Sequence, residues 1–225
     1  MNLYMRKWRM KYRFILLLLL ALMGMFIGVV ITIDGPVHGI DAFFLTIATD
    51  IHNHQLVIQI LEGTSFFASK PMIIVLSLLL VGILGFNKRD AVGAVTVLAF
   101  VLSGYLLNNA VKVWIERLRP TLGVEGYSFP SGHAMLGLML YGFLLFFIIL
   151  YVKNEALKKA SIVVFSLLIL FIGISRFLLA EHYMTDVLGG YLLGGFWLTV
   201  GLLFYTLVKA YLAPTTPMSS KQYMG

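Results

Sequence analysis

Six long apolar stretches constrain this chain more than any other feature of its sequence. A helix needs roughly 20 apolar residues to cross a bilayer, and five stretches come close to that length: 14–33, 91–111, 134–152, 161–179 and 187–208. The remaining stretch, at about 71–86, becomes long enough if Ser65–Ser69 extend it and Lys70 reaches the interface with its amine. Only 12% of the 225 residues are charged, whereas soluble domains have about 25%. We therefore expect an all-α integral membrane fold, a bundle of six transmembrane helices in one domain spanning 1–225.

The segments outside these stretches carry weaker signals. Residues 40–61, between the first and second spans, are partly amphipathic and are expected to lie along the membrane interface. The first stretch, with its basic prefix, also resembles a secretory signal, but its apolar run is longer than usual and no small-x-small cleavage site follows. We interpret it as a retained anchor. Residues 213–225 are expected to be a disordered tail.

The basic residues predict the orientation of the bundle. Cations gather on the cytoplasmic side of membrane proteins, and twelve of the 17 fall on one side of the six spans: Arg6, Lys7, Arg9, Lys11, Arg13, Lys88, Arg89, Lys153, Lys158, Lys159, Lys209 and Lys221. This pattern places both termini in the cytoplasm and the protein in the cell membrane. Because the basic residues follow membrane topology, the net charge of +7 gives no reason to expect a nucleic-acid partner.

The opposite, extracytoplasmic side holds five cations: Lys70, Lys112, Arg117, Arg119 and Arg176. Four of these belong to or adjoin three short motifs on that side: Lys112-x6-Arg119-Pro120, Pro130-Ser131-Gly132-His133 and Arg176-x5-His182-x3-Asp186. Positive charge on the disfavoured side, next to apolar spans, needs a reason. An anionic ligand supplies one, so the three motifs together predict a phosphate site.

Each motif suits a part of that chemistry. Lys112 and Arg119 are seven residues apart, close to two helical turns, and are expected to share one helix face that Pro120 terminates. Arg117 points elsewhere on such a helix and is a weaker candidate, while Glu116 could pair with either cation. Arginine binds phosphate through its planar fork and lysine as a point charge. Alone, the motif also fits an ordinary basic collar at the interface.

The second motif is expected to open the fourth span, with Pro130 in its first turn. Free N–H groups at a helix N-terminus attract anions, the Ser131 hydroxyl adds a donor, and Gly132 lets the backbone approach a ligand. His133 could protonate a leaving oxygen. Without the other motifs, a simple helix cap with an interfacial histidine explains the pattern equally well.

In the third motif, His182 and Asp186 are four residues apart and would be neighbours on a helix. A carboxylate that accepts one imidazole N–H leaves the other nitrogen basic, as a nucleophilic histidine requires. Arg176 adds a cation from the end of the fifth span. A plain interfacial His–Asp hydrogen bond is the alternative for this motif taken alone.

The order, spacing and shared side of the motifs resemble the tripartite signature of the type 2 phosphatidic acid phosphatase family, over about 91–208. The chain looks closest to small bacterial members of the phosphatidylglycerophosphatase B and undecaprenyl-diphosphate phosphatase types. The resemblance implies that His182 is the nucleophile, that Asp186 orients it and that His133 is the general acid. It also implies that the phosphate is held by Lys112, Arg119, Ser131, Gly132 and Arg176. The family needs no metal or cofactor.

Three functions fit these residues. The favoured one is a lipid phosphatase that hydrolyses phosphatidylglycerophosphate, phosphatidate or undecaprenyl diphosphate through a phosphohistidine. A phosphotransferase would pass the same phosphoryl group to an alcohol. An anion transporter would keep the cations but has no use for the His182–Asp186 pair. Nothing in the sequence predicts an oligomeric state.

Metal sites have little support in this sequence. The chain has no cysteine, which excludes disulfides and thiolate ligands. His52 and His54 form a His-x-His pair, but no third ligand is obviously paired with them. We expect them to be solvated interfacial histidines.

Overall fold

The computed structural model describes residues 3–33, 37, 39–121 and 125–213. All regular elements in these ranges are helices, so the all-α expectation is confirmed. The expected tail at 213–225 lies outside the described residues, except for Ala213. The elements are α1 Leu3–Thr32, α2 Ile40–Ile51, α3 Gln55–Phe66, α4 Lys70–Gly82, the π-helix η1 Ile83–Asn87, α5 Ala91–Ile115, α6 Gly132–Tyr151, α7 Glu155–Leu178 and α8 Met184–Leu212.

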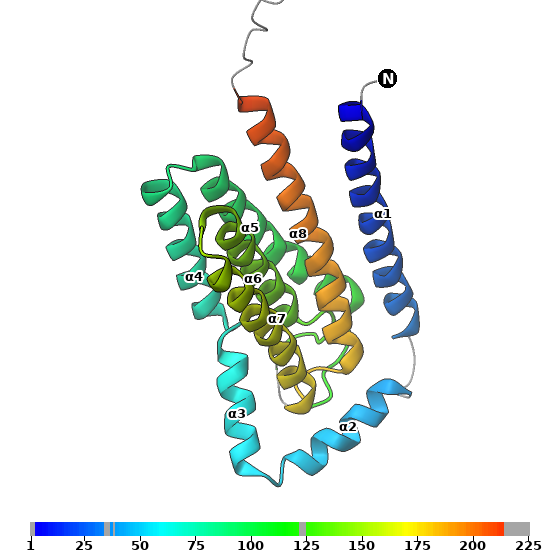
Figure 1. Ribbon diagram of the computed structural model, residues 1–225. Coiled ribbons are helices and arrows are strands. Elements are labelled where there is room, and N and C mark those ends of the chain that lie inside the picture. The colour runs from blue at the N-terminus through cyan, green and yellow to red at the C-terminus, as the bar shows by residue number, and fades with distance from the viewer. Residues whose placement is uncertain (1–2, 34–36, 38, 122–124, 214–225) are drawn as a thin grey trace, which may run out of the picture.

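Six segments of the described chain are long and apolar enough to cross a membrane, as the six-helix expectation required. Five match the predicted stretches closely. The second differs, because it covers Gln55–Asn87 rather than about 71–86, and it is built from α3, α4 and η1 in succession. The predicted interfacial segment 40–61 is therefore wrong as one unit. A turn at His52–His54 divides it into α2, which crosses the end of the bundle, and α3, which leads into α4 (Figure 1).

The core is centred on α6, which packs against α5, α7 and α8. Met135, Met139 and Phe143 of α6 are fully buried. On α8, a Cβ at Gly190 would lie 2.6 Å from the Ser131 carbonyl oxygen, and one at Gly194 would lie 2.8 Å from that of Met135. Glycine at these two positions therefore lets the backbones of α6 and α8 approach closely.

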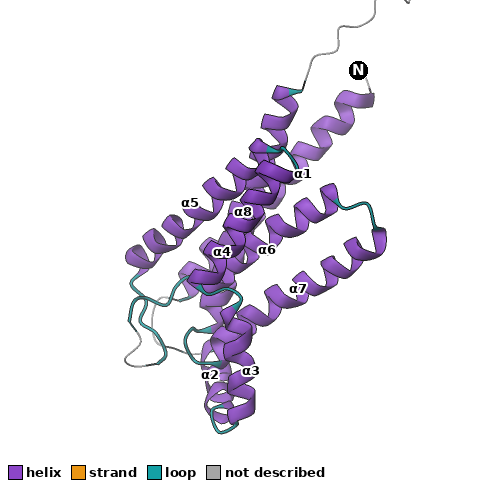
Figure 2. Ribbon diagram, turned by 90° about the vertical axis from the view of Figure 1, so that its left-hand side faces the viewer, coloured by secondary structure: helices purple, strands orange, loops and turns teal. Residues whose placement is uncertain are grey.

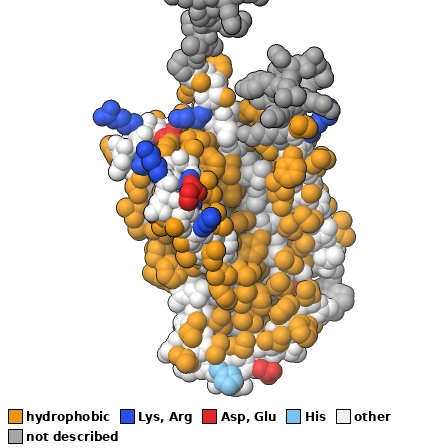
Figure 3. Space-filling model, in the orientation of Figure 1, with side chains coloured by type: hydrophobic (Ala, Val, Ile, Leu, Met, Phe, Trp, Pro, Cys, Tyr) orange, Lys and Arg blue, Asp and Glu red, His pale blue; other side chains and the backbone are white. Residues whose placement is uncertain are grey.

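The two ends of the bundle differ in character. The chain starts α1 and finishes α8 at the same end, here called the terminal end (Figure 1). The α5–α6 loop gathers at the opposite end, near α2 and α3, here called the site end (Figure 2). On the face seen in Figure 3, hydrophobic side chains cover the middle and lysines and arginines lie toward the terminal end. The bundle therefore presents an apolar belt to the bilayer.

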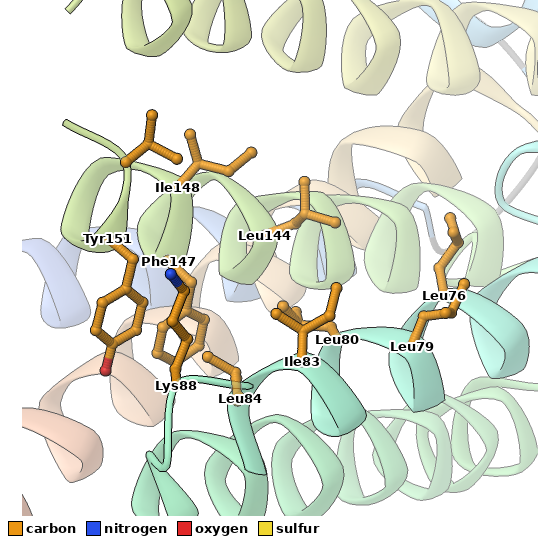
Figure 4. Close-up of a pocket in the computed structure, with 11 residues that line it drawn as sticks. Leu76, Leu79, Leu80, Ile83, Leu84, Lys88, Leu144, Phe147, Ile148 and Tyr151 are labelled. Atoms are coloured by element: carbon orange, nitrogen blue, oxygen red, sulfur yellow. The ribbon is translucent and has the colours of Figure 1, made fainter. Parts of the chain in front are cut away.

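The terminal end is held together by one buried carboxylate. Asp90 caps α5 through Gly93 N at 3.1 Å and accepts hydrogen bonds from Tyr151 at 2.6 Å, Tyr205 at 2.9 Å and Lys209 at 3.2 Å. It therefore connects α5, α6 and α8. Beside this cluster, an apolar groove of about 340 Å³ runs between α4 and α6, with Lys88 and Tyr151 toward one end (Figure 4). None of the predicted site residues lines this groove.

Candidate active site

A polar cavity of about 300 Å³ at the site end collects the three sequence motifs. Six of the eight residues predicted for the site line it, namely Lys112, Arg119, Gly132, His133, Arg176 and His182. The other two, Ser131 and Asp186, are fully buried and do not line it. The motifs come from α5, α6, α7, α8 and the loops that follow α5 and α7, so the bundle assembles one site from segments far apart in the chain.

The first motif reaches the cavity by a different route from the one expected. The helix α5 ends at Ile115, and Glu116 follows in the left-handed conformation with φ 54° and ψ 24°. Arg119 and Pro120 therefore lie in a loop, and the prediction that Lys112 and Arg119 share one helix face was wrong. Glu116 does not pair with either cation as suggested, because its carboxylate accepts a hydrogen bond from the Tyr127 hydroxyl at 3.0 Å.

Loop carbonyls hold the first motif in position. Lys112 Nζ donates to the carbonyl oxygens of Tyr127 at 2.5 Å and Ser128 at 3.3 Å. Arg119 Nε donates to the Gly126 carbonyl at 3.1 Å, and its Nη1 donates to that of Glu181 at 2.9 Å. Both cations are thereby fixed by neutral acceptors, which leaves their positive charge available to an anion in the cavity.

His182 is the most informative side chain in the site. Its Nε2 lies 3.3 Å from Arg119 Nη1, and its Nδ1 lies 3.5 Å from Asp186 Oδ2. A guanidinium can only donate, so we assign the lone pair to Nε2 and the proton to Nδ1, facing the carboxylate. Burial lowers the pKa of His182 to about 4 although Asp186 favours its charged form. The imidazole is therefore neutral near pH 7, with its basic Nε2 beside Arg119, which also lines the cavity.

The prediction that one helix carries both His182 and Asp186 was wrong in detail. The helix α8 begins at Met184, so His182 lies in the preceding turn and Asp186 in the first helical turn. The two side chains are still neighbours because the turn folds back over the helix start. There Asp186 Oδ2 accepts the Tyr183 backbone N–H at 2.8 Å and forms a capping box.

Helical geometry made Arg117 a weaker candidate, but the structure places it against Asp186. Its Nη1 donates to Asp186 Oδ1 at 2.6 Å, and its Nη2 donates to Asp41 Oδ2 at 2.7 Å. The left-handed turn at Glu116 redirects the chain, which is why a helical projection failed here. Two signals could have found the pair: a fifth cation on the disfavoured side, and an acidic residue in the segment 40–61.

Arg176 lines the cavity but is already engaged. One of its Nη atoms donates to Ser65 Oγ of α3, and the other forms an ion pair with Glu181. Sequence reasoning missed both partners. Glu181 also lines the cavity, directly before His182. An anion that binds Arg176 must therefore compete with this carboxylate.

The second motif forms the start of α6, but not in the predicted way. Ser131 is the N-cap, so Pro130 lies before the helix rather than in its first turn, and the Phe129–Pro130 peptide bond is cis. The Ser131 hydroxyl accepts from Ala134 N at 3.5 Å and is buried, so it does not face the cavity as a phosphate donor. The Ser131 N–H instead donates to the Asp186 carbonyl at 2.9 Å, joining the second motif to the third.

The His-x-His pair lies outside the site. His52 Nδ1 is 2.7 Å from the Ala48 carbonyl at the end of α2, and His54 is exposed before α3. Among the described residues, no group of three His, Asp or Glu side chains is arranged to hold a metal ion. The cavity instead brings together four cations, Lys70, Lys112, Arg119 and Arg176, and two imidazoles, a donor set suited to a phosphate group.

A six-span bundle with these three motifs around one cavity defines a class of membrane protein, and the PAP2 superfamily profile matches residues 93–210. The chain belongs to this superfamily, which confirms the resemblance to the type 2 phosphatidic acid phosphatases.

The known proteins that are similar to the chain include a curated relative and a solved structure from Bacillus subtilis. Phosphatidylglycerophosphatase B of Bacillus subtilis (strain 168) is 28% identical over 158 residues, which cover 68% of this chain and 74% of that relative. A solved structure, described as the first transmembrane PAP2 type phosphatidylglycerolphosphate phosphatase from Bacillus subtilis, gives a TM-score of 0.67 at 23% identity. The match covers 89% of this chain and 98% of that one. The fold is therefore shared along nearly the whole chain.

Proposed function

We propose that this protein is an integral membrane phosphatase that hydrolyses lipid phosphates through a phosphohistidine at His182. One observation carries the proposal: His182, with Asp186 behind its Nδ1 and Arg119 beside its Nε2, lines a cavity that is also lined by Lys112, Arg119 and Arg176. An anion transporter would use the cations, but it would not need a histidine with a carboxylate behind it. Hydrolysis uses every one of these groups.

The chemistry follows from the positions of the two histidines. The Nε2 lone pair of His182 attacks phosphorus, the bond to the lipid oxygen breaks, and that oxygen leaves with the bonding pair and takes a proton from His133. Water then attacks the phosphohistidine and gives a proton to His133, and the P–N pair returns to Nε2. Lys112, Arg119 and Arg176 stabilise the charge on the phosphoryl oxygens, and the Gly132 N–H adds a donor.

A second cavity supports a lipid substrate. An apolar groove of about 360 Å³ lies between α4 and α5 and shares Lys70, Tyr105 and Leu136 with the catalytic cavity. Its other lining residues are almost all aliphatic, including Ile73, Leu98 and others of the two helices. A hydrocarbon chain in this groove would bring an attached phosphate to His182. A soluble phosphate ester has no hydrocarbon chain to fill this groove, so the groove favours a lipid substrate.

The site supports a class of substrate, the lipid phosphates, more firmly than any particular lipid. The name of the Bacillus subtilis relative favours phosphatidylglycerophosphate, whereas the site chemistry also accepts phosphatidate or undecaprenyl diphosphate. A lipid phosphotransferase remains the second candidate, because the same phosphohistidine can transfer to an alcohol. We place the site on the extracytoplasmic face of the cell membrane with both termini in the cytoplasm, since Lys88, Arg89 and Lys153 lie in loops at the terminal end.

The proposal includes metal independence, since Lys112, Arg119 and Arg176 already line the cavity in which the phosphate would bind. The test is phosphate release by purified protein in detergent with a chelator, over a panel of lipid monophosphates and diphosphates. Release should persist with chelator and stop with vanadate, a mimic of the transition state. His182→Ala should retain below about one per cent of wild-type turnover, whereas the control His54→Ala should match wild type. Activity that needs magnesium, or that survives in His182→Ala, would overturn the mechanism. Phosphorylated alcohol formed with lipid acceptors would favour the phosphotransferase.

A further inference from the structure

Arg117 lies between two buried carboxylates that come from opposite parts of the chain. Its Nη1 contacts Asp186 Oδ1 at 2.6 Å and its Nη2 contacts Asp41 Oδ2 at 2.7 Å. Asp41 belongs to α2 and Asp186 to α8. The guanidinium also stacks 4.2 Å from the centre of the Tyr183 ring. The Tyr183 ring therefore fixes the plane of the guanidinium, and the two carboxylates fix its two Nη atoms.

Thr185 closes this arrangement into a ring of hydrogen bonds. Its backbone N–H donates to Asp41 Oδ1 at 2.9 Å, and its hydroxyl donates to Asp41 Oδ2 at 2.6 Å. Arg117 Nη1 donates to the same hydroxyl at 2.8 Å. The α2 carboxylate thus binds both the arginine and the first turn of α8. The helix that crosses the site end is fastened directly behind the His182–Asp186 pair.

The burial of these groups makes the cation necessary. The exposed fractions of the side chains are 11% for Arg117, 6% for Asp41 and 0% for Asp186. A buried carboxylate that loses its cationic partner is strongly destabilised, because little water can replace the partner. Asp186 has only its two oxygens to offer: Oδ1 is held by Arg117, and Oδ2 receives Tyr183 N–H and faces His182. The orientation of Oδ2 toward His182 therefore depends on what holds Oδ1.

We propose that Arg117 and Asp41 are positioning residues of the reaction, and that α2 is part of the catalytic unit through them. They hold Asp186 so that it keeps the proton of His182 on Nδ1 and the lone pair of Nε2 toward the substrate. Neither residue lines the catalytic cavity. This inference rests on the proposed function, since it assigns roles in the same phosphoryl transfer.

The role predicts which kinetic constant changes. The phosphate-binding cations Lys112, Arg119 and Arg176 are outside this network. Loss of Arg117 should therefore slow the attack of His182 and leave substrate binding nearly intact. A general weakening of the fold would instead reduce the amount of active protein, which titration with vanadate can count.

The test compares Arg117→Gln, Arg117→Lys and Asp41→Asn with the control Asp50→Asn, an exposed carboxylate on the same helix. Arg117→Gln should lower kcat by about 10- to 100-fold, by analogy with the loss seen when partners that orient metal-binding histidines are removed. Its KM should stay within about twofold of wild type, whereas its vanadate affinity should fall together with kcat, because vanadate mimics the transition state. Arg117→Lys should recover part of kcat because it keeps a cation. Asp41→Asn should lower kcat in the same way, and Asp50→Asn should not.

A double variant gives a second measurement. If Asp41 acts through Arg117, Arg117→Gln with Asp41→Asn should be no slower than Arg117→Gln alone. Wild-type kcat in Arg117→Gln, or a rise in KM without a fall in kcat, would overturn the inference. If Arg117→Gln fails to purify, Thr185→Val tests the same ring and should lower kcat with KM unchanged; unchanged kcat there would count against it. Loss of activity in His182→Ala, measured alongside, separates a failure of this inference from a failure of the proposed function.

Discussion

Glu181 forms an ion pair with Arg176, a cation that we expect to bind the phosphate of the substrate. Its carboxylate pairs with Arg176 at the edge of the catalytic cavity. Glu181→Gln removes the competing charge and should strengthen inhibition by inorganic phosphate, by about 3- to 10-fold for a partly buried charge pair. The inhibition constant at fixed pH is the measurement.

The matched control is Glu125→Gln. Glu125 also lines the cavity, but it forms none of the ion pairs found among the described residues. If both variants strengthen inhibition by phosphate equally, the cause is the loss of negative charge from the cavity as a whole. The idea that Glu181 competes with phosphate for Arg176 would then be rejected.

His133 has a separate role that a choice of leaving group can reveal. It lines the cavity on the first turn of α6, and we assign it the proton for the departing oxygen. An aryl phosphate leaves as a stabilised phenolate and needs less protonation. We therefore expect His133→Ala to keep a larger fraction of its activity on nitrophenyl phosphate than on a lipid monophosphate, and His182→Ala to lose both alike. Equal fractional losses in His133→Ala, with chemistry rate-limiting, would remove the general-acid role.

At the scale of elements, the site depends on how closely α8 approaches α6. A methyl group at Gly190 would meet the Ser131 carbonyl at 2.6 Å, and Ser131 also donates its N–H to Asp186. Gly190→Ala should therefore displace the start of α6 and lower both the melting temperature and kcat. Overpacking of this kind costs about 1–3 kcal/mol.

Gly195→Ala is the control on the same helix. Its added methyl would find its nearest neighbour, a Leu138 side chain atom, at 3.7 Å, which is ordinary contact. Thermal unfolding and turnover in detergent should distinguish the two variants. Similar behaviour of both would mean that the close approach at Gly190 is not what fixes the site.

Hydropathy predicted most of the elements because a membrane span is a property of local composition. Hydropathy missed the first part of the second span, α3, since Gln55, Gln59 and Glu62 interrupt its apolar run. It also assigned the whole of 40–61 to the membrane interface, whereas the second membrane-length segment already begins at Gln55. The His52 ring bonds back to the Ala48 carbonyl where α2 ends, a local contact that an amphipathic pattern does not contain.

The motifs predicted which side chains line the cavity, but not how they are held. Spacing rules assume a continuous helix, and the left-handed residue Glu116 breaks that assumption just before Arg117. The Arg117–Asp41 contact joins positions 76 residues apart, so no local spacing could reveal it. The burial of Ser131 likewise depends on the close packing of α8. These features depend on tertiary contacts rather than on neighbouring residues.

At the scale of the whole molecule, the sidedness of the bundle can be tested directly. The chain has no cysteine, so a single introduced thiol reports one position. Glu125 is exposed in the site-end loop and Lys153 is exposed in the α6–α7 loop. We expect Glu125→Cys to react with an impermeant reagent on intact cells and Lys153→Cys to react only after lysis. The reverse pattern would place the site in the cytoplasm.

The stability of the whole protein should depend on pH through His182. Burial holds the pKa of this histidine at about 4 in the folded protein, whereas an unfolded chain has the ordinary value of about 6.5. Between these values the unfolded state binds a proton that the folded state refuses, so protonation favours unfolding as pH falls. The contribution of His182 is unaffected above pH 6.5 and is lost progressively down to about pH 4, by on the order of a few kcal/mol.

Replacing the imidazole isolates this contribution from other titrating groups. The melting temperature of wild type in detergent should fall between pH 6.5 and 4.5, and that of His182→Asn should fall less over the same range. The histidine stays neutral in the folded enzyme, so kcat/KM should show no loss near pH 6.5 that is due to His182. We expect the acid limb of the kcat/KM profile that is due to His182 to lie closer to pH 4, where Nε2 takes a proton and can no longer attack. Parallel melting curves for the two proteins, with an acid limb near 6.5, would show that His182 is not a buried neutral base.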